Sequence, residues 1–466
     1  MDSSTFTNLP LGPQIINNLE SLGYHSMTPI QEETLPAILE GKDILGQAKT
    51  GSGKTAAFGL GIISKIDLKN LNIQALVLCP TRELAEQVAN EIRRLARFTS
   101  NTKVLAIFGG TLEFKQVNSL KHGAHIIVAT PGRVLKHLKK GAIDLEQLKV
   151  LVLDEADRML DMGFEEQMDE IATYTPKDKQ TLLFSATYPH EIKSLCDSLK
   201  ISPEIIKIDA KHEKEVIEQK FIKVKDHQQK FTALLKVLAN FRPESTLVFC
   251  KTKFTCDEVF NFFLRNQVSA IAIHGDLDQN ERTLALTKFS NRSALILVAT
   301  DVAARGLDIK DLQAVINFDL AIDAEVYTHR IGRTARAGKT GHAFSFFVDN
   351  ERGKLSDIEA FLERKNELMD LTELSGSLVF DLKPPMRTMV IGAGKKDKIR
   401  PGDILGALIG EAGLQADQVG IISIFDTSTL VAVKSELMSS TISKLKNGKI
   451  KGRSFRVFEA KNIIRN

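Results

Sequence analysis

The eight residues from Ala48 to Thr55 (Ala-Lys-Thr-Gly-Ser-Gly-Lys-Thr) constrain this 466-residue chain more than any other feature. Its glycines let the backbone curl so that successive N–H groups point at phosphate oxygens, and its second lysine adds a point charge for the β- and γ-phosphates. The complete Gly-x-Gly-Lys-Thr ending, preceded by the apolar stretch 43–46, disfavours a mere glycine-rich turn. We therefore expect the whole string to hold a nucleotide: Ala48, Lys49, Thr50, Gly51, Ser52, Gly53, Lys54 and Thr55.

Two carboxylates, Asp154 and Glu155, follow the apolar run Val150–Leu153 further along the chain. One carboxylate can hold Mg²⁺, in part through water, and the next can orient or deprotonate an attacking water. We expect Asp154 and the hydroxyl of Thr55 to hold the metal, Glu155 to act on water and Lys54 to assist catalysis. The two strings together predict ATP and Mg²⁺ as cofactors, with hydrolysis to ADP and phosphate.

The composition sets limits on the class of protein. Because domains usually hold about 100–200 residues, the chain is too long for one ordinary core. A hydrophobic content of 43% and a charged content of 26% fit a globular protein. No stretch approaches the ~20 apolar residues of a membrane span, and the first residues do not resemble a signal peptide. The 4 cysteines are scattered and form no metal-binding motif, so we expect a reduced, cytoplasmic protein with no membrane partner.

Apolar runs alternate with amphipathic stretches over residues 1–208 and again over residues 216–370. Near-continuous β-rich runs separated by helices indicate parallel sheets that are buried on both faces. Residues 209–215 are polar and are expected to form a linker. Residues 371–385 are expected to form a second one, which ends in the stiff tether Lys383-Pro384-Pro385. The second α/β domain has no phosphate cradle of its own.

Residues 386–466 show the order β-α-β-β-α-β, which is that of the ferredoxin-like sandwich of RNA-recognition motifs. The strands are expected near 387–392, 420–425, 429–434 and 454–459, and the helices near 402–411 and 436–446. From residue 381 onward, 15 Lys and Arg face 8 Asp and Glu, a net charge of +7 that leaves −3 for the rest of the chain. This charge indicates a polyanion-binding module, although a solvated basic face without a partner would show the same count.

Further polar strings follow the expected strands, in the order Pro80–Ala85, Thr130–Arg133, Ser185–Thr187, Ala299–Asp308 and His329–Gly338. Together with the phosphate cradle and the acidic pair, they resemble the superfamily 2 DEAD-box RNA helicases over residues 1 to about 370. The resemblance implies an α/β fold of two tandem RecA-like parallel-sheet domains, followed here by a small α+β RRM-like (ferredoxin-like) domain. It also implies an RNA-dependent ATPase that unwinds RNA locally.

The resemblance assigns several nucleotide contacts. Thr28-Pro29-Ile30-Gln31 is similar to the family's Q motif, with Phe6 as the upstream aromatic residue. By that similarity Phe6 stacks on adenine, Gln31 hydrogen-bonds the edge of the base, and Asp308 contacts the ribose. In the implied mechanism Ser185 and Thr187 couple the nucleotide to closure of the two domains.

Two arginines of the second domain complete the implied catalytic site. Arg333 and Arg336 stand three residues apart, and we expect them on one helix face. The resemblance assigns them as fingers that contact the γ-phosphate. Because they lie on a separate domain, hydrolysis would depend on domain closure.

RNA is expected on the opposite rim of both domains. Backbone N–H groups, hydroxyls and arginines suit phosphates and 2′-hydroxyls, so this contact should not depend on base sequence. The candidates are Arg82, Gly110, Thr130 and Arg133 in the first domain, and Thr252, Lys253, Gly275, Thr300 and Asp301 in the second.

The C-terminal domain resembles the RNA-binding domain of the DbpA (YxiN) subfamily, through residues 394–408 and 447–453. That resemblance implies 23S rRNA, recognised at hairpin 92, and the large-subunit precursor as partners. The first and third expected strands carry no aromatic residue that could stack bases. A basic surface that reads a folded hairpin by shape and phosphates therefore fits better. Its candidates are Lys395, Lys396, Lys449, Lys451 and Arg453.

Three other functions compete with the helicase. An ATP-gated RNA clamp without productive turnover is disfavoured by the presence of Glu155, Arg333 and Arg336. A general RNA chaperone without 23S specificity would share every ATP-binding feature. A DNA helicase is disfavoured by the RNA-type C-terminal module and the Q motif, so we expect no DNA partner.

Overall fold

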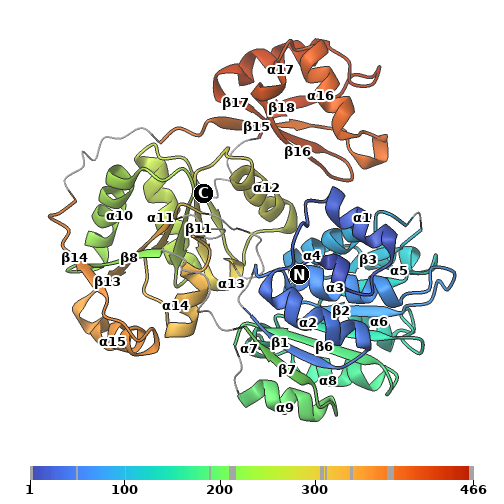
Figure 1. Ribbon diagram of the computed structural model, residues 1–466. Helices are drawn as coiled ribbons and strands as arrows, with labels where there is room; N and C mark the ends of the chain where they lie inside the picture. The colour runs from blue at the N-terminus through green and yellow to red at the C-terminus, as the bar shows by residue number, and fades with distance from the viewer. Residues whose placement is uncertain are drawn as a thin grey trace. The chain divides into compact units, whose positions relative to one another are not determined.

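The computed structural model falls into two compact units, one of described residues up to 208 and one of those from 217 onward (Figure 1). For His190 and Glu191 it describes the backbone only. The described residues are 4–48, 51–99, 101–187, 190–208, 217–304, 309, 312–335, 340–374 and 382–460.

The first unit is built on a seven-stranded sheet in the order β3-β4-β2-β5-β6-β1-β7, in which the paired strands run parallel. Its strands are β1 (Ile44–Gln47), β2 (Ala75–Leu78), β3 (Val104–Ile107), β4 (Ile126–Ala129), β5 (Val150–Asp154), β6 (Gln180–Ser185) and β7 (Glu204–Lys207). Its helices are α1 (Pro13–Ser21), α2 (Pro29–Glu40), α3 (Lys54–Lys65), α4 (Arg82–Leu95), α5 (Glu113–Leu120), α6 (Pro131–Lys139), α7 (Ala156–Asp161), α8 (Glu165–Thr173) and α9 (His190–Ser198).

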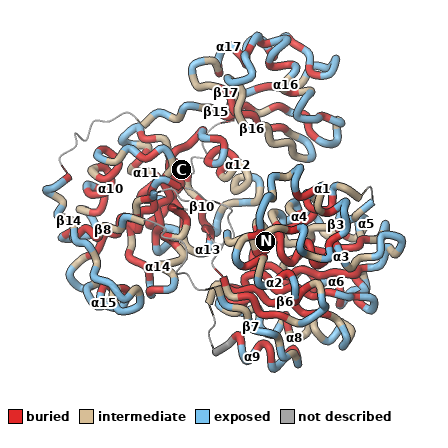
Figure 2. Tube along the Cα trace, in the orientation of Figure 1, coloured by how far each residue is buried: buried red, intermediate tan, exposed pale blue. Residues whose placement is uncertain are grey.

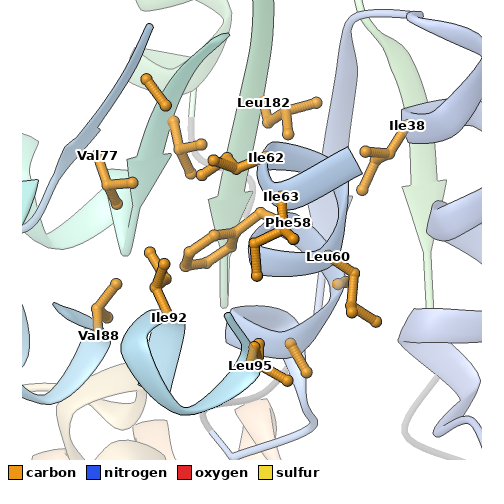
Figure 3. Close-up of a cluster of buried hydrophobic side chains, with 14 of the residues drawn as sticks. Ile38, Phe58, Leu60, Ile62, Ile63, Val77, Val88, Ile92, Leu95 and Leu182 are labelled. Atoms are coloured by element: carbon orange, nitrogen blue, oxygen red, sulfur yellow. The ribbon is translucent and has the colours of Figure 1, made fainter. Parts of the chain in front are cut away.

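Both faces of this sheet are buried at its central strands β2, β4, β5 and β6, which show as buried segments in Figure 2, whereas the edge strand β7 is largely exposed. Leu182 belongs to the core that packs against α1–α4, whereas its neighbour Leu183 belongs to the core under α6–α9. This alternation follows from the two-residue period of a strand. Figure 3 shows the first of these cores, in which Phe58 of α3 lies among aliphatic side chains from α3, α4 and the sheet. The apolar runs in the sequence therefore fill a core on each side.

The second unit begins with another seven-stranded sheet, in the order β10-β11-β9-β12-β13-β8-β14, again with parallel pairs. Its strands are β8 (Ile217–Lys223), β9 (Thr246–Cys250), β10 (Ala270–Ile273), β11 (Ile296–Thr300), β12 (Ala314–Asn317), β13 (Gly341–Phe347) and β14 (Glu367–Met369). Its helices are α10 (His227–Phe241), α11 (Lys253–Arg265), α12 (Gln279–Ser290), α13 (Asp301–Ala304), α14 (Ala324–Ile331) and α15 (Arg352–Phe361). The prediction of two parallel-sheet domains is confirmed.

The C-terminal domain has the predicted order of strands and helices around a four-stranded antiparallel sheet, β16-β17-β15-β18. Its elements are β15 (Met386–Ile391), α16 (Pro401–Gly410), β16 (Val419–Ile424), β17 (Thr429–Lys434), α17 (Met438–Asn447) and β18 (Val457–Glu459). The last strand begins three residues later than expected, and before it residues 450–453 form a tight turn in which Lys451 and Gly452 have φ of 52° and 76°.

Within the part of the chain that the structure describes, no helix combines the length and the apolar character needed to cross a membrane.

Candidate nucleotide and RNA site

The nucleotide residues of the first unit gather at one edge of its sheet. Strands β5, β6 and β1 are neighbours and run parallel, so their carboxyl ends meet at the same edge. Asp154 and Ser185 end β5 and β6, Glu155 follows β5 directly, and the phosphate cradle follows β1. Ligands of open α/β sheets bind outside such carboxyl ends, which places the predicted residues where a nucleotide would lie.

The phosphate cradle has the backbone that its glycines predict. Gly51 and Gly53 have φ of 85° and 97°, a region that side-chain-bearing residues rarely occupy. A Cβ atom on Gly53 would also lie 2.6 Å from Gln31 Nε2 and 2.8 Å from Thr28 Oγ1. Gln31 Nε2 donates a hydrogen bond to the Gly53 carbonyl at 3.1 Å, so the Gln31 side chain packs directly on the cradle. Lys49 and Thr50 lie outside the described residues.

Two polar side chains in the cradle suit a phosphate. Lys54 is 5% exposed, and its Nζ donates to the Ala48 carbonyl at 2.7 Å. The hydroxyl of Ser52 is buried without a hydrogen-bond partner among the described residues. Since buried polar groups are nearly always hydrogen-bonded, a phosphate oxygen would satisfy this one. The cradle thus fits the triphosphate of ATP.

Asp154 is the last residue of β5 and is 3% exposed. Burial raises the pKa of its carboxyl group to about 7, against the opposing effect of the Lys54 ammonium group. A bound cation would favour the ionised carboxylate. Among the described residues, no group of three or more His, Cys, Asp or Glu side chains is arranged so that it could hold a metal ion by itself. Mg²⁺ takes one or two protein carboxylates and completes its shell with phosphates and water, so a buried carboxylate at Asp154 fits this ion.

Glu155 combines backbone strain with an unsatisfied carboxylate. Its φ of 53° lies in the left-handed region, and its side chain is 6% exposed. Its Oε2 atom is buried without a hydrogen bond and lies 3.5 Å from Arg158 Nε. Strain and unsatisfied polar atoms of this kind cluster at functional sites. The geometry is consistent with the role predicted for Glu155 as the residue that acts on water.

Asp157 of α7, to which the sequence analysis gave no role, holds the loop after β6 through its carboxylate. Its Oδ2 accepts hydrogen bonds from Ala186 N, Thr187 N and Thr187 Oγ1, each at 3.1 Å. The Ser185 hydroxyl donates to the Thr187 carbonyl at 2.6 Å. The predicted coupling residues Ser185 and Thr187 therefore depend on a carboxylate beside the acidic pair. The sequence signal that could have identified Asp157 is its place two residues after Glu155, as the second Asp of the string Asp-Glu-Ala-Asp at residues 154–157.

The predicted RNA residues of the first unit lie on the other half of the sheet edge, after the neighbouring strands β2, β3 and β4. Arg82 begins α4, and a Cβ atom on Gly109 would lie 2.9 Å from its Nη2. Gly110 has φ of 85°, while Thr130 caps α6, whose first turn contains Arg133. The structure thus separates the candidate RNA rim from the nucleotide loops along one edge.

The second unit repeats this arrangement. Thr252 and Lys253 follow β9, Gly275 follows β10, and Thr300 and Asp301 lie at the end of β11, and these three strands are neighbours. The Lys253 ammonium group pairs with Asp276 at 2.8 Å.

The carboxylate of Asp301 is already paired. Arg330 Nε and Nη2 donate to its two oxygens, each at 2.7 Å, and the guanidinium is 3% exposed. Arg330 also donates to Asn317 Oδ1 at 2.9 Å and to the Asp319 carbonyl at 2.7 Å. Sequence reasoning missed Arg330, although it lies inside the string His329–Gly338. The pair fixes the start of α13 to α14, so both carboxylate oxygens of Asp301 are held by Arg330.

The expectation that Arg333 and Arg336 share a helix face is wrong. Helix α14 ends at Ile331, and Arg333 lies in the following turn. The helix cannot continue because Thr334 forms a bridge with Leu312 and Ala335 has φ of 55°. The side chain of Arg333 is 6% exposed. Arg336 and Asp308 lie outside the described residues.

The basic segments of the C-terminal domain meet in one cluster. Lys451 Nζ donates to the Lys398 carbonyl at 2.8 Å, and Arg453 Nη2 donates to the Asp397 carbonyl at 2.7 Å. The turn 449–453 therefore packs on the turn 395–398. We call the exposed cations of these two turns the basic cluster, which consists of Lys395, Lys396, Lys398, Lys449, Lys451 and Arg453.

Phe6 lies in the short helical turn Phe6–Asn8. It is 4% exposed, and its ring meets that of Tyr24 edge to face at 6.3 Å.

Three family models match the chain. The DEAD/DEAH box helicase model covers residues 28–195, the helicase conserved C-terminal domain covers residues 229–338, and the DbpA RNA binding domain covers residues 388–458. The matches follow the two parallel-sheet domains and the C-terminal domain in order.

Similar proteins cover nearly the whole chain. It is 49% identical over 454 residues to the ATP-dependent RNA helicase DbpA of Escherichia coli K12, and the aligned region spans 97% of this chain and 98% of that protein. It is 44% identical over 377 residues to the DEAD-box ATP-dependent RNA helicase CshA of Geobacillus kaustophilus, at 80% of each. The solved structure of S. cerevisiae Dbp5 bound to RNA and ADP BeF3 is 29% identical, with a TM-score of 0.73, over 79% of this chain and 96% of that one.

Proposed function

The chain belongs to the DEAD-box RNA helicases and is an ATP-dependent RNA helicase of DbpA type, and on that premise we propose that it remodels 23S rRNA near hairpin 92 during large-subunit assembly. The observation that carries this specificity is the basic cluster on a C-terminal domain that matches the DbpA RNA binding domain. A folded hairpin suits such a cluster, because phosphates and shape are read there without base stacking. The cytoplasm is the proposed compartment, and the large-subunit precursor is the proposed partner.

In the proposed nucleotide site, Lys54 and the cradle hold the phosphates, while Thr55 and Asp154 hold Mg²⁺. The metal neutralises charge on the β- and γ-phosphates when it is bound. Glu155 orients the attacking water and takes its proton, because its carboxylate is buried beside Asp154 and has no hydrogen bond at Oε2. Gln31 reads the adenine edge, Phe6 stacks on the base, and Asp308 contacts the ribose.

Arg333 and Arg336 are proposed to supply cations for the transition state from the second domain. A site whose cations stand on another domain reaches full activity only when the domains close. We propose that residues Ser185–Thr187 couple the γ-phosphate of ATP to closure of the two helicase domains, because Asp157 holds this segment beside the acidic pair. RNA along the two rims would stabilise the closed state without regard to base sequence.

The test is steady-state ATPase activity of the full chain with a panel of nucleic acids. The panel contains a 23S fragment with hairpin 92, a scrambled RNA of equal length, random RNA, and single- and double-stranded DNA. We expect the hairpin fragment to stimulate turnover at the lowest concentration and DNA to give no stimulation.

The basic cluster should carry this preference. The triple reversal Lys449→Glu, Lys451→Glu and Arg453→Glu should abolish the advantage of the hairpin and flatten its salt dependence, since phosphate contacts release counterions. Lys446→Glu, an exposed change on α17, serves as the matched control. Equal stimulation by hairpin and scrambled RNA in the wild type would favour the second candidate, a general RNA chaperone.

A further inference from the structure

The second helicase domain and the C-terminal domain share a buried polar contact inside the second unit. Thr388 of β15 is 2% exposed, and its Oγ1 accepts a hydrogen bond from Asn291 Nδ2 at 3.0 Å and donates to Ser293 Oγ at 2.8 Å. Asn291 and Ser293 are themselves 3% and 6% exposed, in the turn after α12. Three polar side chains from two domains therefore satisfy one another at this junction.

This contact covers part of the sheet face that RNA-recognition modules normally offer to bases. Met389 and Ile391 of β15 point into the core under α16 and α17, so Thr388 and Val390 lie on the opposite face. The turn after α12 covers this face at Thr388. Bases cannot stack there, and any RNA contact on this side must lie at its margin.

A groove of about 1120 Å³ opens beside the contact, lined by residues of both domains. Its charged lining residues are Lys288, Lys383, Arg387, Arg456, Glu436 and Glu459, so cations exceed carboxylates by two. Arg387 and Glu459 pair through two hydrogen bonds of 2.7 and 2.5 Å and hold β15 to β18. When this pair is set aside, three cations and one carboxylate line the groove, so its net charge is positive.

Lys288 reaches this groove from α12. It is 6% exposed, and its Nζ lies 3.5 Å from the Ala460 carbonyl, to which it donates. Burial lowers the pKa of this ammonium group. An anion in the groove would favour its charged form.

An aromatic ring stands at the rim of the same groove. Phe458 of β18 is 40% exposed and pairs with Val390 across the sheet, on the face away from the helices. The Arg456 guanidinium lies over the ring, 5.0 Å from its centroid. An exposed ring beside cations is the combination with which proteins bind single-stranded nucleic acid, one base on the ring and phosphates on the cations.

We propose that this groove binds an unpaired RNA segment flanking the hairpin, with one base stacked on Phe458 and adjacent phosphates held by Arg456 and Lys383. The inference rests on the proposed function, since it extends the RNA contact beyond the basic cluster. Stacking of one base contributes about 5- to 150-fold in affinity.

The test measures binding of the full chain to three RNAs by fluorescence anisotropy at fixed salt. They are a minimal hairpin 92, the same hairpin with an unstructured extension on either side, and the unstructured strand alone. Phe458→Ala should weaken binding of one extended hairpin by about 5- to 150-fold, Arg456→Glu should weaken the same complex, and both should leave the minimal hairpin unchanged. Ile421→Ala, an exposed apolar residue outside the groove, and Lys446→Glu should leave all three unchanged. A thermal unfolding scan confirms that each variant is folded.

The outcomes separate the groove from the proposed function. The groove proposal is overturned if neither extension strengthens wild-type binding, or if Phe458→Ala and Arg456→Glu weaken the minimal hairpin as much as the extended one. If the wild type binds the hairpin no better than scrambled RNA, the proposed 23S specificity fails. The groove is then judged on the unstructured strand alone, which the wild type must bind more tightly than both variants.

Discussion

Removal of the Asp157 carboxylate should loosen the loop after β6. Asp157 is 5% exposed, and one of its oxygens accepts three hydrogen bonds, two from backbone N–H groups and one from a hydroxyl. In Asp157→Ala the Thr187 hydroxyl can turn elsewhere, but the two backbone donors lose their acceptor. At about 1–3 kcal/mol for each unsatisfied donor, we expect a loss of about 3 kcal/mol in the free energy of unfolding.

Two milder variants calibrate this loss. Asp157→Asn keeps an oxygen for the loop but turns an NH₂ group toward the Arg158 N–H, which now donates to Oδ1 at 3.0 Å. It should lose about 1–2 kcal/mol. Thr187→Val removes only the hydroxyl bond and should lose about 1 kcal/mol. Glu166→Ala, an exposed change on α8 of the same unit, is the control.

Differential scanning calorimetry of the full chain measures the effect, because the first unit should give its own transition. A loss of about 3 kcal/mol lowers the midpoint of a unit of this size by about 6–12 °C. RNA-stimulated turnover should fall along the same series, while the affinity for ADP changes little. The reasoning is refuted if Asp157→Ala unfolds with the wild type, or if Thr187→Val costs as much as Asp157→Ala.

Three further predictions concern the catalytic groups. Glu155→Gln should lower turnover by about 10²–10⁴ and leave ATP and RNA binding in place, which kcat and ATP-dependent RNA retention measure together. Turnover near the wild-type rate would contradict its role as the base. Arg333→Ala should lower RNA-stimulated kcat by about 10³–10⁵ with little change in ATP binding. If the variant keeps most of its rate, Arg333 does not act as an arginine finger. The pKa of Asp154 is raised to about 7 by burial, above its value of about 3.9 in an unfolded chain. Its contribution to stability is therefore present below pH 4 and is lost as the pH rises through 7. Without nucleotide, the wild type should lose stability across this range, whereas Asp154→Asn should lose less. Parallel pH profiles of the two proteins would show that the carboxyl group does not titrate there.

The sequence predicted the elements whose signal is local. A glycine-lysine-threonine string must form a cradle, because only glycine tolerates the φ of 85° and 97° found at residues 51 and 53. Short, near-continuous apolar runs rich in β-branched residues and separated by helical patterns indicate strands buried on both faces, and the order β-α-β-β-α-β of the last domain follows from its periodicity. Long-range partners were not predictable in the same way. Asp157 meets Thr187 across 30 residues, and Arg330 meets Asp301 across 29, and no spacing rule identifies such pairs.

Arg333, which the sequence analysis expected on a helix, shows why residue spacing alone does not predict the geometry of a site. A separation of three residues predicts a shared helix face only if the helix continues, and α14 ends two residues before Arg333. The turn that ends it is set by the bridge from Thr334 to Leu312, a contact between segments more than a helix length apart. With φ of 55° at Ala335, the chain leaves the helix at an angle that the helical period cannot describe. A helix that continued would place both arginines on one rigid face, whereas this turn lets the direction of Arg333 depend on the β-bridge. The position of Arg333 in this chain therefore rests on a tertiary contact rather than on helical register.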